Sequence, residues 1–72
     1  MPKFHELLKK ARLAKGYTQK QTAEKVGVTL VSYQRWEYDM RIPESQYLLK
    51  LITVLELDAV EVSRSLEDAV KT

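Results

Sequence analysis

The sequence contains no cysteine and one histidine, and glycine and proline occur only twice each. The absence of cysteine excludes disulfides, thiolate zinc sites and cysteine nucleophiles, and a single histidine excludes a multi-histidine metal centre. Apolar residues never run for more than a few positions, so no segment is long enough to span a bilayer. Residues 1–5 lack the apolar core of a signal peptide. We therefore expect a cytoplasmic protein without a metal, a cofactor or a membrane partner.

The 72 residues have the composition of one small globular domain, with 44% hydrophobic and 31% charged residues. We assign residues 1–66 to this domain and expect residues 67–72 to form a short, frayed tail. Residues 1–41 carry nine Lys and Arg against four Asp and Glu, whereas residues 42–72 carry three against six. The basic half is typical of a protein that binds a polyanion, although solvated helix faces also carry such imbalances.

Helical spacing of apolar residues indicates that the chain begins with a helix over residues 2–15, ending at Gly16. Proline suits the first turn of a helix, and glycine suits the residue after its last turn. The apolar face consists of Phe4, Leu8 and Ala11, or of Leu7, Ala11 and Ala14.

Cap residues predict two short helices in the middle of the chain. Thr18 and Gln21 have the spacing of a capping box, which opens a second helix ending at Val26. Gly27 can then adopt a left-handed turn. A third helix is expected over residues 29–38, with a threonine hydroxyl as its N-cap.

Two further helices are expected in the second half of the chain. Pro43 marks the approach to the fourth helix, which has the most regular apolar spacing in the sequence. Asp58 and Glu61 have cap-like spacing at the start of the fifth. The apolar residues of these helices are Leu48, Leu51, Ile52 and Leu55, then Val62 and Leu66. The sequence therefore predicts an all-α fold of five short helices.

The second and third helices, joined by a three-residue turn centred on glycine, have the spacing of a helix-turn-helix. Ala23 is small enough for the close approach of two helices that cross near a right angle. Gly27 can supply the positive φ of the turn. The side chains expected to point inward are Val26, Val28, Tyr33 and Trp36.

The motif extends well beyond these two helices. It contains Arg12, Gly16-Tyr-Thr-Gln19, Ala23, Val26-Gly-Val-Thr29, Tyr33, Trp36-Glu37 and Pro43. This pattern resembles the Xre family of DNA-binding domains, which are of the lambda-repressor and Cro type. The resemblance covers about residues 4–65 and implies a compact, five-helix, lambda-repressor-like domain that inserts its third helix into the DNA major groove.

The resemblance also implies a buried ion pair between Arg12 and Glu37. Three residues differ from the usual pattern of the family. Thr22 stands where the family usually has leucine, so the core is slightly under-filled or the hydroxyl reaches a carbonyl. Asp39 stands where glycine is usual; aspartate tolerates the left-handed conformation, but its charge is expected to weaken DNA binding modestly. Met40 stands where a basic residue is common.

The outward residues of the third helix are the expected base-reading residues. The Arg35 guanidinium matches guanine O6 and N7, and Gln34 can pair with adenine N6 and N7; a phosphate contact is the alternative for Arg35. Leu30 and Val31 replace residues that are often polar in the family, and they can only contact thymine methyl groups. Thr29 completes this set.

Contacts to DNA phosphates are expected from the start of the second helix, where free N–H groups and the helix dipole favour anions, and from the loop after the third. The phosphate-contacting residues are expected to be Thr18, Gln19, Ser32, Tyr38 and Arg41. Such contacts position a protein on DNA without specifying sequence.

One helix-turn-helix covers only half of an operator, so the resemblance implies a homodimer on a near-palindromic site with half-sites about 34 Å apart. We expect the dimer surface around Leu57, Ala59 and Val60 and along the fifth helix, although Val60 and Leu66 could instead only complete the monomer core. We expect no small-molecule effector. The leading hypothesis is a sequence-specific, double-stranded DNA-binding transcriptional regulator, such as a repressor or a small controller protein.

A second hypothesis is a protein-interaction module on the same fold, such as an antitoxin or adaptor, with Leu30 and Val31 in a protein-binding patch. An enzyme is not expected. His5 lies near the terminus, and no serine has a base at a recognisable spacing.

Overall fold

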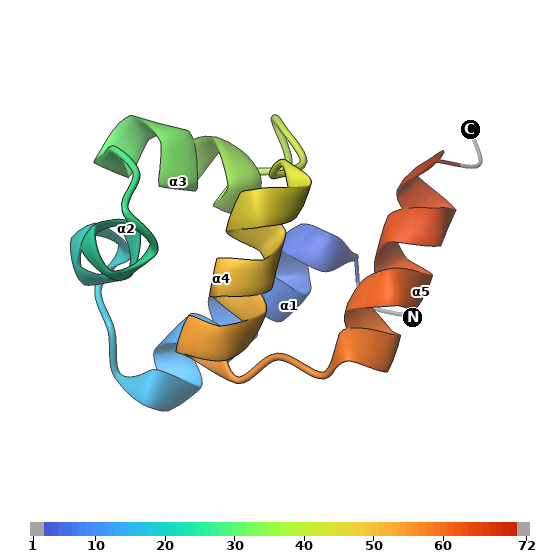
Figure 1. The fold of residues 1–72 in the computed structure, drawn as a ribbon, viewed down its shortest axis with the longest axis horizontal. Helices are drawn as coiled ribbons and strands as arrows, with labels where there is room; N and C mark the ends of the chain where they lie inside the picture. Colours follow the sequence, from blue (N-terminus) through green and yellow to red (C-terminus); the bar gives the residue numbers. More distant parts are fainter. Residues whose placement is uncertain (1–2, 71–72) are drawn as a thin grey trace.

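The computed structural model of the protein describes residues 3–70, and their side chains as far as residue 67. This part of the chain contains five helices and no strand, which confirms the predicted all-α fold. The helices are α1 (Phe4–Lys15), α2 (Gln19–Val26), α3 (Leu30–Glu37), α4 (Ser45–Leu55) and α5 (Ala59–Val70). Figure 1 shows α2 and α3 at one end of the molecule and α5 at the other, with α4 crossing α1 between them.

Local caps set the ends of the first three helices. Gly16 and Gly27 follow α1 and α2 with left-handed φ angles of 73° and 88°, a conformation that glycine adopts without steric cost. Thr18 Oγ1 accepts a hydrogen bond from the Gln21 backbone N–H at 3.0 Å, and Gln21 Oε1 accepts from the Thr18 N–H at 2.9 Å. The predicted capping box is therefore present. Pro2, expected in the first turn of α1, lies outside the described residues.

The second half of the fold differs in detail from the sequence-based expectation. α4 begins at Ser45, two residues after Pro43, and ends at Leu55. Glu56, the residue after it, has a left-handed φ of 53°. Asp58 Oδ1 accepts hydrogen bonds from two backbone N–H groups at the start of α5, at 2.8 and 3.2 Å. α5 includes residues 67–70 of the expected tail, whereas residues 71–72 lie outside the described part. Fraying of the tail in solution stays a prediction.

The core is formed by residues from all five helices. Its buried members are Phe4, Leu8, Ala23, Val26, Tyr33, Trp36, Leu51, Leu55 and Val62. Half-buried apolar side chains, including Val28, Leu48, Ile52 and Leu66, pack against this cluster from its periphery. The Tyr33 and Trp36 rings meet edge-to-face, with centroids 6.1 Å apart. The inward side of α3 is thereby fixed against the rest of the domain.

Thr22, which stands where leucine is usual in the family, is fully buried. Its hydroxyl donates a hydrogen bond of 3.0 Å to the Thr18 carbonyl oxygen, so burial leaves the hydroxyl satisfied. The second departure, Asp39, adopts a left-handed φ of 61° and keeps the turn after α3. Its carboxylate Oδ1 lies 3.6 Å from His5 Nδ1 on α1.

Candidate nucleic-acid interface

The helix α3 has one buried side and one exposed side. Tyr33, Trp36 and Glu37 point into the domain, and all three are buried. Leu30 and Val31 lie on the exposed side, with 38% and 56% of their surface accessible. Arg35, one helical turn after Val31, is also exposed. A short helix that buries one side and presents the other as a ridge has the shape that fits a DNA major groove.

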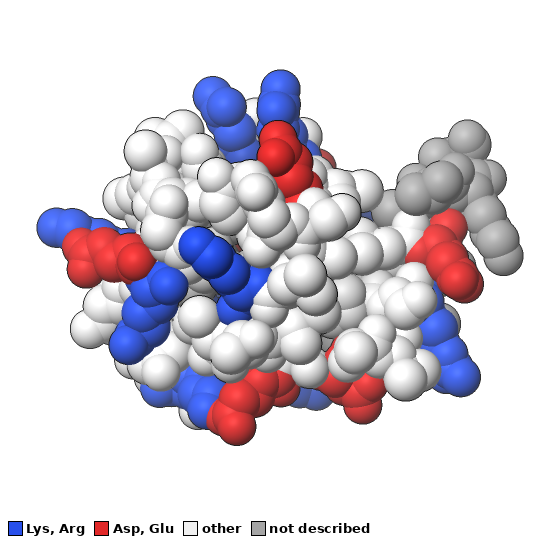
Figure 2. Space-filling model, viewed as in Figure 1, with Lys and Arg blue, Asp and Glu red and all other residues white. Residues whose placement is uncertain are grey.

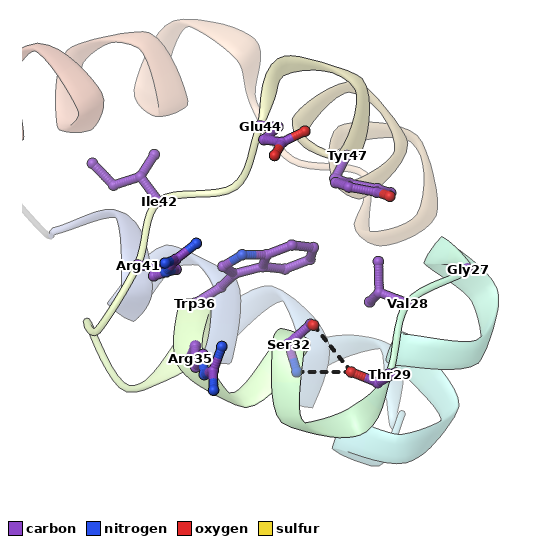
Figure 3. A pocket seen from close by; sticks show the side chains of 10 residues that line it. All are labelled: Gly27, Val28, Thr29, Ser32, Arg35, Trp36, Arg41, Ile42, Glu44 and Tyr47. Carbon is purple, nitrogen blue, oxygen red and sulfur yellow. Dashed lines mark hydrogen bonds between the residues drawn. The ribbon is translucent and has the colours of Figure 1, made fainter.

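The first turn of α3 is held by its own polar side chains (Figure 3). Thr29 Oγ1 accepts from the Ser32 backbone N–H at 3.2 Å and donates to Ser32 Oγ at 3.0 Å. The Thr29 hydroxyl, expected among the base-reading groups, therefore acts as the N-cap of α3. Ser32 is half-buried beside it.

A network of three side chains joins α2 to α3. Gln19 Nε2, in the first turn of α2, donates a hydrogen bond to the Tyr38 hydroxyl at 3.1 Å. Gln34 Nε2 donates to Gln19 Oε1 at 3.2 Å. Two expected phosphate-contacting residues and one expected base-reading residue therefore contact one another. The network fixes the position of the start of α2 relative to α3.

A groove of about 470 Å³ lies between α3 and the start of α4 (Figure 3). Arg35 and Arg41 line it, together with Ser32, and no acidic residue of α3 does. Glu44 lines its far side. Two guanidinium groups beside a half-buried hydroxyl form a surface that can attract a phosphate.

Apart from Thr29, the remaining side chains that line this groove are apolar or aromatic. Ile42, Trp36 and Tyr47 lie along it, with the Trp36 and Tyr47 ring centroids 5.8 Å apart. Sequence reasoning did not place Ile42 or Tyr47 near the site. Tyr47 resembles a core aromatic of α4, and Ile42 lies in the loop before α4, whose path brings both residues to α3.

Behind α3, Arg12 and Glu37 form a buried bidentate ion pair. Arg12 Nη2 donates to Glu37 Oε1 at 2.7 Å and Arg12 Nε donates to Glu37 Oε2 at 3.0 Å. Arg12 Nη1 donates a third hydrogen bond, to the Tyr17 carbonyl oxygen at 2.9 Å. The pair thus connects α1, the loop before α2 and the end of α3.

The ion pair shifts the titration of its members. Hydrogen bonds to Glu37 raise the pKa of Arg12 above its ordinary value. Burial acts to raise the pKa of Glu37, but the hydrogen bonds and the charge of Arg12, together with smaller contributions from neighbouring polar side chains, outweigh it, and this pKa lies below its ordinary value. Burial raises the pKa of the neighbouring Tyr33 hydroxyl, whose oxygen has no hydrogen-bond partner among the described residues.

The surface away from α3 carries a different mixture of side chains. Figure 2 shows charged groups above α3 and around α2, whereas uncharged groups cover most of the surface over α4 and toward α5. Leu49 on α4 and Val60 on α5 are exposed apolar residues. Of the expected dimer residues, Ala59 and Val60 are exposed, while Leu57 is half-buried and packs against the core.

Within residues 3–70, no helix combines the length and the apolar character needed to cross a membrane. The described side chains also contain no group of three His, Cys, Asp or Glu residues placed to hold a metal ion.

Comparison with known proteins agrees with this geometry. Residues 8–62 match the model of the helix-turn-helix family. An uncharacterized HTH-type transcriptional regulator derived from the SPbeta prophage, YonR of Bacillus subtilis (strain 168), is 38% identical over 52 residues. The match covers 72% of this chain and 48% of that protein, so the chain spans about half the length of this relative. No solved structure was found to match. From its five helices, its glycine-centred turn and the family match over residues 8–62, the chain belongs to the helix-turn-helix family of Xre type.

Proposed function

We propose that the protein is a sequence-specific, double-stranded DNA-binding transcriptional regulator that inserts α3 into the major groove. The observation that carries the proposal is the two-sided arrangement of α3. Tyr33 and Trp36 fix its inner side in the core, and Val31 and Arg35 project from its outer side. The name of the prophage-derived relative, an HTH-type transcriptional regulator, supports the same function.

Arg35 is the proposed principal base-reading residue, since its guanidinium can donate two hydrogen bonds to guanine O6 and N7. Leu30 and Val31 would contact thymine methyl groups beside it. Thr29 and Gln34 would support these contacts, because their side chains already hydrogen bond to Ser32 and Gln19.

Phosphate contacts are proposed on both flanks of α3. The start of α2 offers backbone N–H groups with the positive end of the helix dipole. The groove between α3 and α4 offers guanidinium groups and a hydroxyl. The proposed contacting residues are Thr18, Gln19 and Tyr38 on the first flank, and Ser32 and Arg41 on the second. These contacts would make binding fall steeply with increasing salt.

We further propose that the protein acts in the cytoplasm as a homodimer on a near-palindromic operator and represses by occupying it. The largely uncharged surface over α4 and toward α5, with Val60 exposed and Ala59 beside it, supports a dimer contact on the side away from α3. Two recognition helices would then reach half-sites about one turn of DNA apart. Substituting Val60→Lys should convert the dimer to a monomer in light scattering while leaving the helical circular dichroism unchanged.

The deciding experiment is selection from a random DNA pool at about 150 mM salt with purified protein. We expect enrichment of a palindromic motif, with Arg35→Ala losing selectivity at one base pair in each half-site. Lys9→Ala, which removes an exposed cation on α1, serves as the control and should keep the motif. Folded protein that enriches no motif would overturn the proposal.

A second candidate function is binding of a protein partner through the outer side of α3, as in an antitoxin or adaptor. The observation that favours it is the exposure of several apolar side chains at and after α3. Val31 and Tyr38 are each 56% exposed, and Met40 is 70% exposed. Exposed apolar groups of this kind mark interaction sites. Salt-dependent retention on DNA would favour the regulator, whereas its absence would favour the adaptor.

A further inference from the structure

The polar side chains on the outer side of α3 are largely engaged with the protein itself. The Thr29 hydroxyl both accepts from and donates to Ser32. Gln34 is half-buried, and its amide nitrogen donates to Gln19. The Arg35 backbone carbonyl accepts from Met40 and Arg41, but its exposed guanidinium makes no hydrogen bond or ion pair with any described residue. Arg35 is therefore the main side chain of α3 that is free to hydrogen bond to DNA bases.

The rest of the outer surface of α3 is aliphatic. Leu30 and Val31 are neighbours in the first turn, and Val31 lies one turn before Arg35 on the same side of the helix; we call these three exposed residues the ridge. In the major groove, the apolar feature of a base pair is the C5-methyl group of thymine. An alkyl side chain can contact that methyl group, but it can neither donate to nor accept from the group at pyrimidine C4.

Thymine and cytosine differ in the major groove at two positions. Thymine has a carbonyl acceptor at C4 and a methyl group at C5, whereas cytosine has an amino donor at C4 and a hydrogen at C5. A surface of leucine and valine can distinguish the two bases only by the presence or absence of the C5-methyl group. A cytosine that carries a 5-methyl group presents the same apolar feature as thymine.

We infer that α3 recognises the pyrimidine 5-methyl group itself, so operator positions facing Leu30 and Val31 accept thymine or 5-methylcytosine and disfavour uracil and unmodified cytosine. This inference rests on the proposed DNA-binding function and names the chemical feature that the site reads. Burying one methyl-sized group corresponds to about a fourfold gain in affinity, and two contacts to about fifteenfold.

The test is one selection carried out in parallel from three random duplex pools. The first pool is natural DNA, the second is made with dUTP in place of dTTP, and the third with 5-methyl-dCTP in place of dCTP. With the first pool we expect a motif with a guanine and adjacent thymines in each half-site. With the second pool the thymine positions should lose selectivity while the guanine is kept. With the third pool these positions should accept either pyrimidine.

Substitutions at exposed positions assign the effect to the ridge. Val31→Ala should reduce the difference in affinity between thymine and uracil duplexes by about fourfold. Leu13→Ala, which removes an exposed aliphatic side chain on α1, is the matched control and should change neither preference.

The outcomes separate this inference from the function on which it rests. No motif in the natural pool overturns both. A motif in the natural pool that is unchanged in the uracil pool overturns methyl recognition alone and leaves DNA reading intact. Loss of the thymine positions in the uracil pool, without acceptance of 5-methylcytosine in the third, overturns the claim that C4 is not sensed.

Discussion

Arg12 and Glu37, twenty-five positions apart in the sequence, are joined by two parallel hydrogen bonds of 2.7 and 3.0 Å. The Glu37 side chain is 1% exposed, and that of Arg12 is 10% exposed. Such a bidentate pair sets the direction as well as the distance between two groups. Since Glu37 ends α3 and Arg12 lies in the last turn of α1, the pair fixes the orientation of α3 from inside the domain.

Glu37→Ala is expected to lower the free energy of unfolding by about 3–5 kcal/mol, because it leaves the Arg12 guanidinium buried without its partner. For a domain of this size the midpoint of thermal unfolding should fall by well over 10 °C, at about 4–8 °C per kcal/mol. Glu24→Ala, on the exposed side of α2, is the control. An unchanged melting curve for Glu37→Ala would contradict a structural role for the pair.

A double substitution separates the buried charge from the lost contact. Replacing both residues with apolar ones, as in Arg12→Met with Glu37→Leu, removes the interaction without leaving an unpaired charge. The double variant is therefore expected to be more stable than Glu37→Ala. Denaturant unfolding of both single variants and the double variant gives the coupling energy directly.

Stability is expected to fall in acid in a way that depends on Glu37. The pKa of this carboxyl is lower in the folded protein than its ordinary 4.5. Its contribution is therefore fully present above about pH 4.5 and is lost as the pH falls through the lower folded value. The difference in unfolding free energy between wild type and Glu37→Gln should stay constant above about pH 5 and shrink as the pH falls from about 4.5 to about 3. A constant difference over this range would show that Glu37 does not titrate with unfolding.

Tyr33→Phe is expected to leave stability unchanged or to raise it by up to about 1 kcal/mol. The ring is fully buried, and its hydroxyl oxygen has no hydrogen-bond partner among the described residues, so the substitution removes a polar group that gains nothing from burial. Thermal unfolding checks this. A loss greater than about 1.5 kcal/mol would indicate that the hydroxyl donates to the Arg12–Glu37 pair.

Glu56→Gly is expected to stabilise the fold by about 0.5–1 kcal/mol. Glu56 follows α4 with a left-handed φ of 53°, which strains any residue with a Cβ atom. The substitution also removes its ion pair with Lys15, but 70% of the Glu56 side chain is exposed, and such pairs contribute little. Lys15→Ala isolates the ion pair and should change the melting temperature by only a few degrees. A destabilised Glu56→Gly variant would mean that the ion pair outweighs the strain.

Asp39→Asn is expected to increase affinity for duplex DNA about twofold to threefold at low salt, because it removes a negative charge next to the proposed phosphate contacts. Asparagine also tolerates the left-handed φ of 61° at this position, so stability should be retained. Glu67→Gln makes the same change in net charge on α5 and should have a smaller effect. Fluorescence anisotropy with a labelled duplex measures both variants. Equal gains would indicate an effect of net charge rather than of position.

The five helices and the helix-turn-helix were predictable because their signals are local. The Thr18–Gln21 capping box, Gly16 and Gly27 each set a helix end through bonds within a few residues. The left-handed turn at Glu56 was not predictable, since neither a glycine nor an asparagine marks it. It is determined by where α4 must end so that α5 can pack on α1, which is a tertiary requirement.

The candidate site was only partly predictable for a similar reason. The exposed positions of Leu30, Val31 and Arg35 follow from helical periodicity once the inward residues are known. The hydrogen bonds of Gln34 and Tyr38 to Gln19 depend on the distance between two helices, and no local pattern fixes that distance. The sequence therefore predicts which residues face outward, but not which of them are already bonded to the protein.

The two-sided arrangement of α3 has a consequence for how this domain can evolve. The residues that hold the helix, such as Trp36 and Glu37, are separate from those that project from it, such as Val31 and Arg35. Substitutions on the projecting side therefore remove no buried contact and should cost little stability. The preferred DNA sequence can drift, or be redesigned, one residue at a time while the scaffold remains intact.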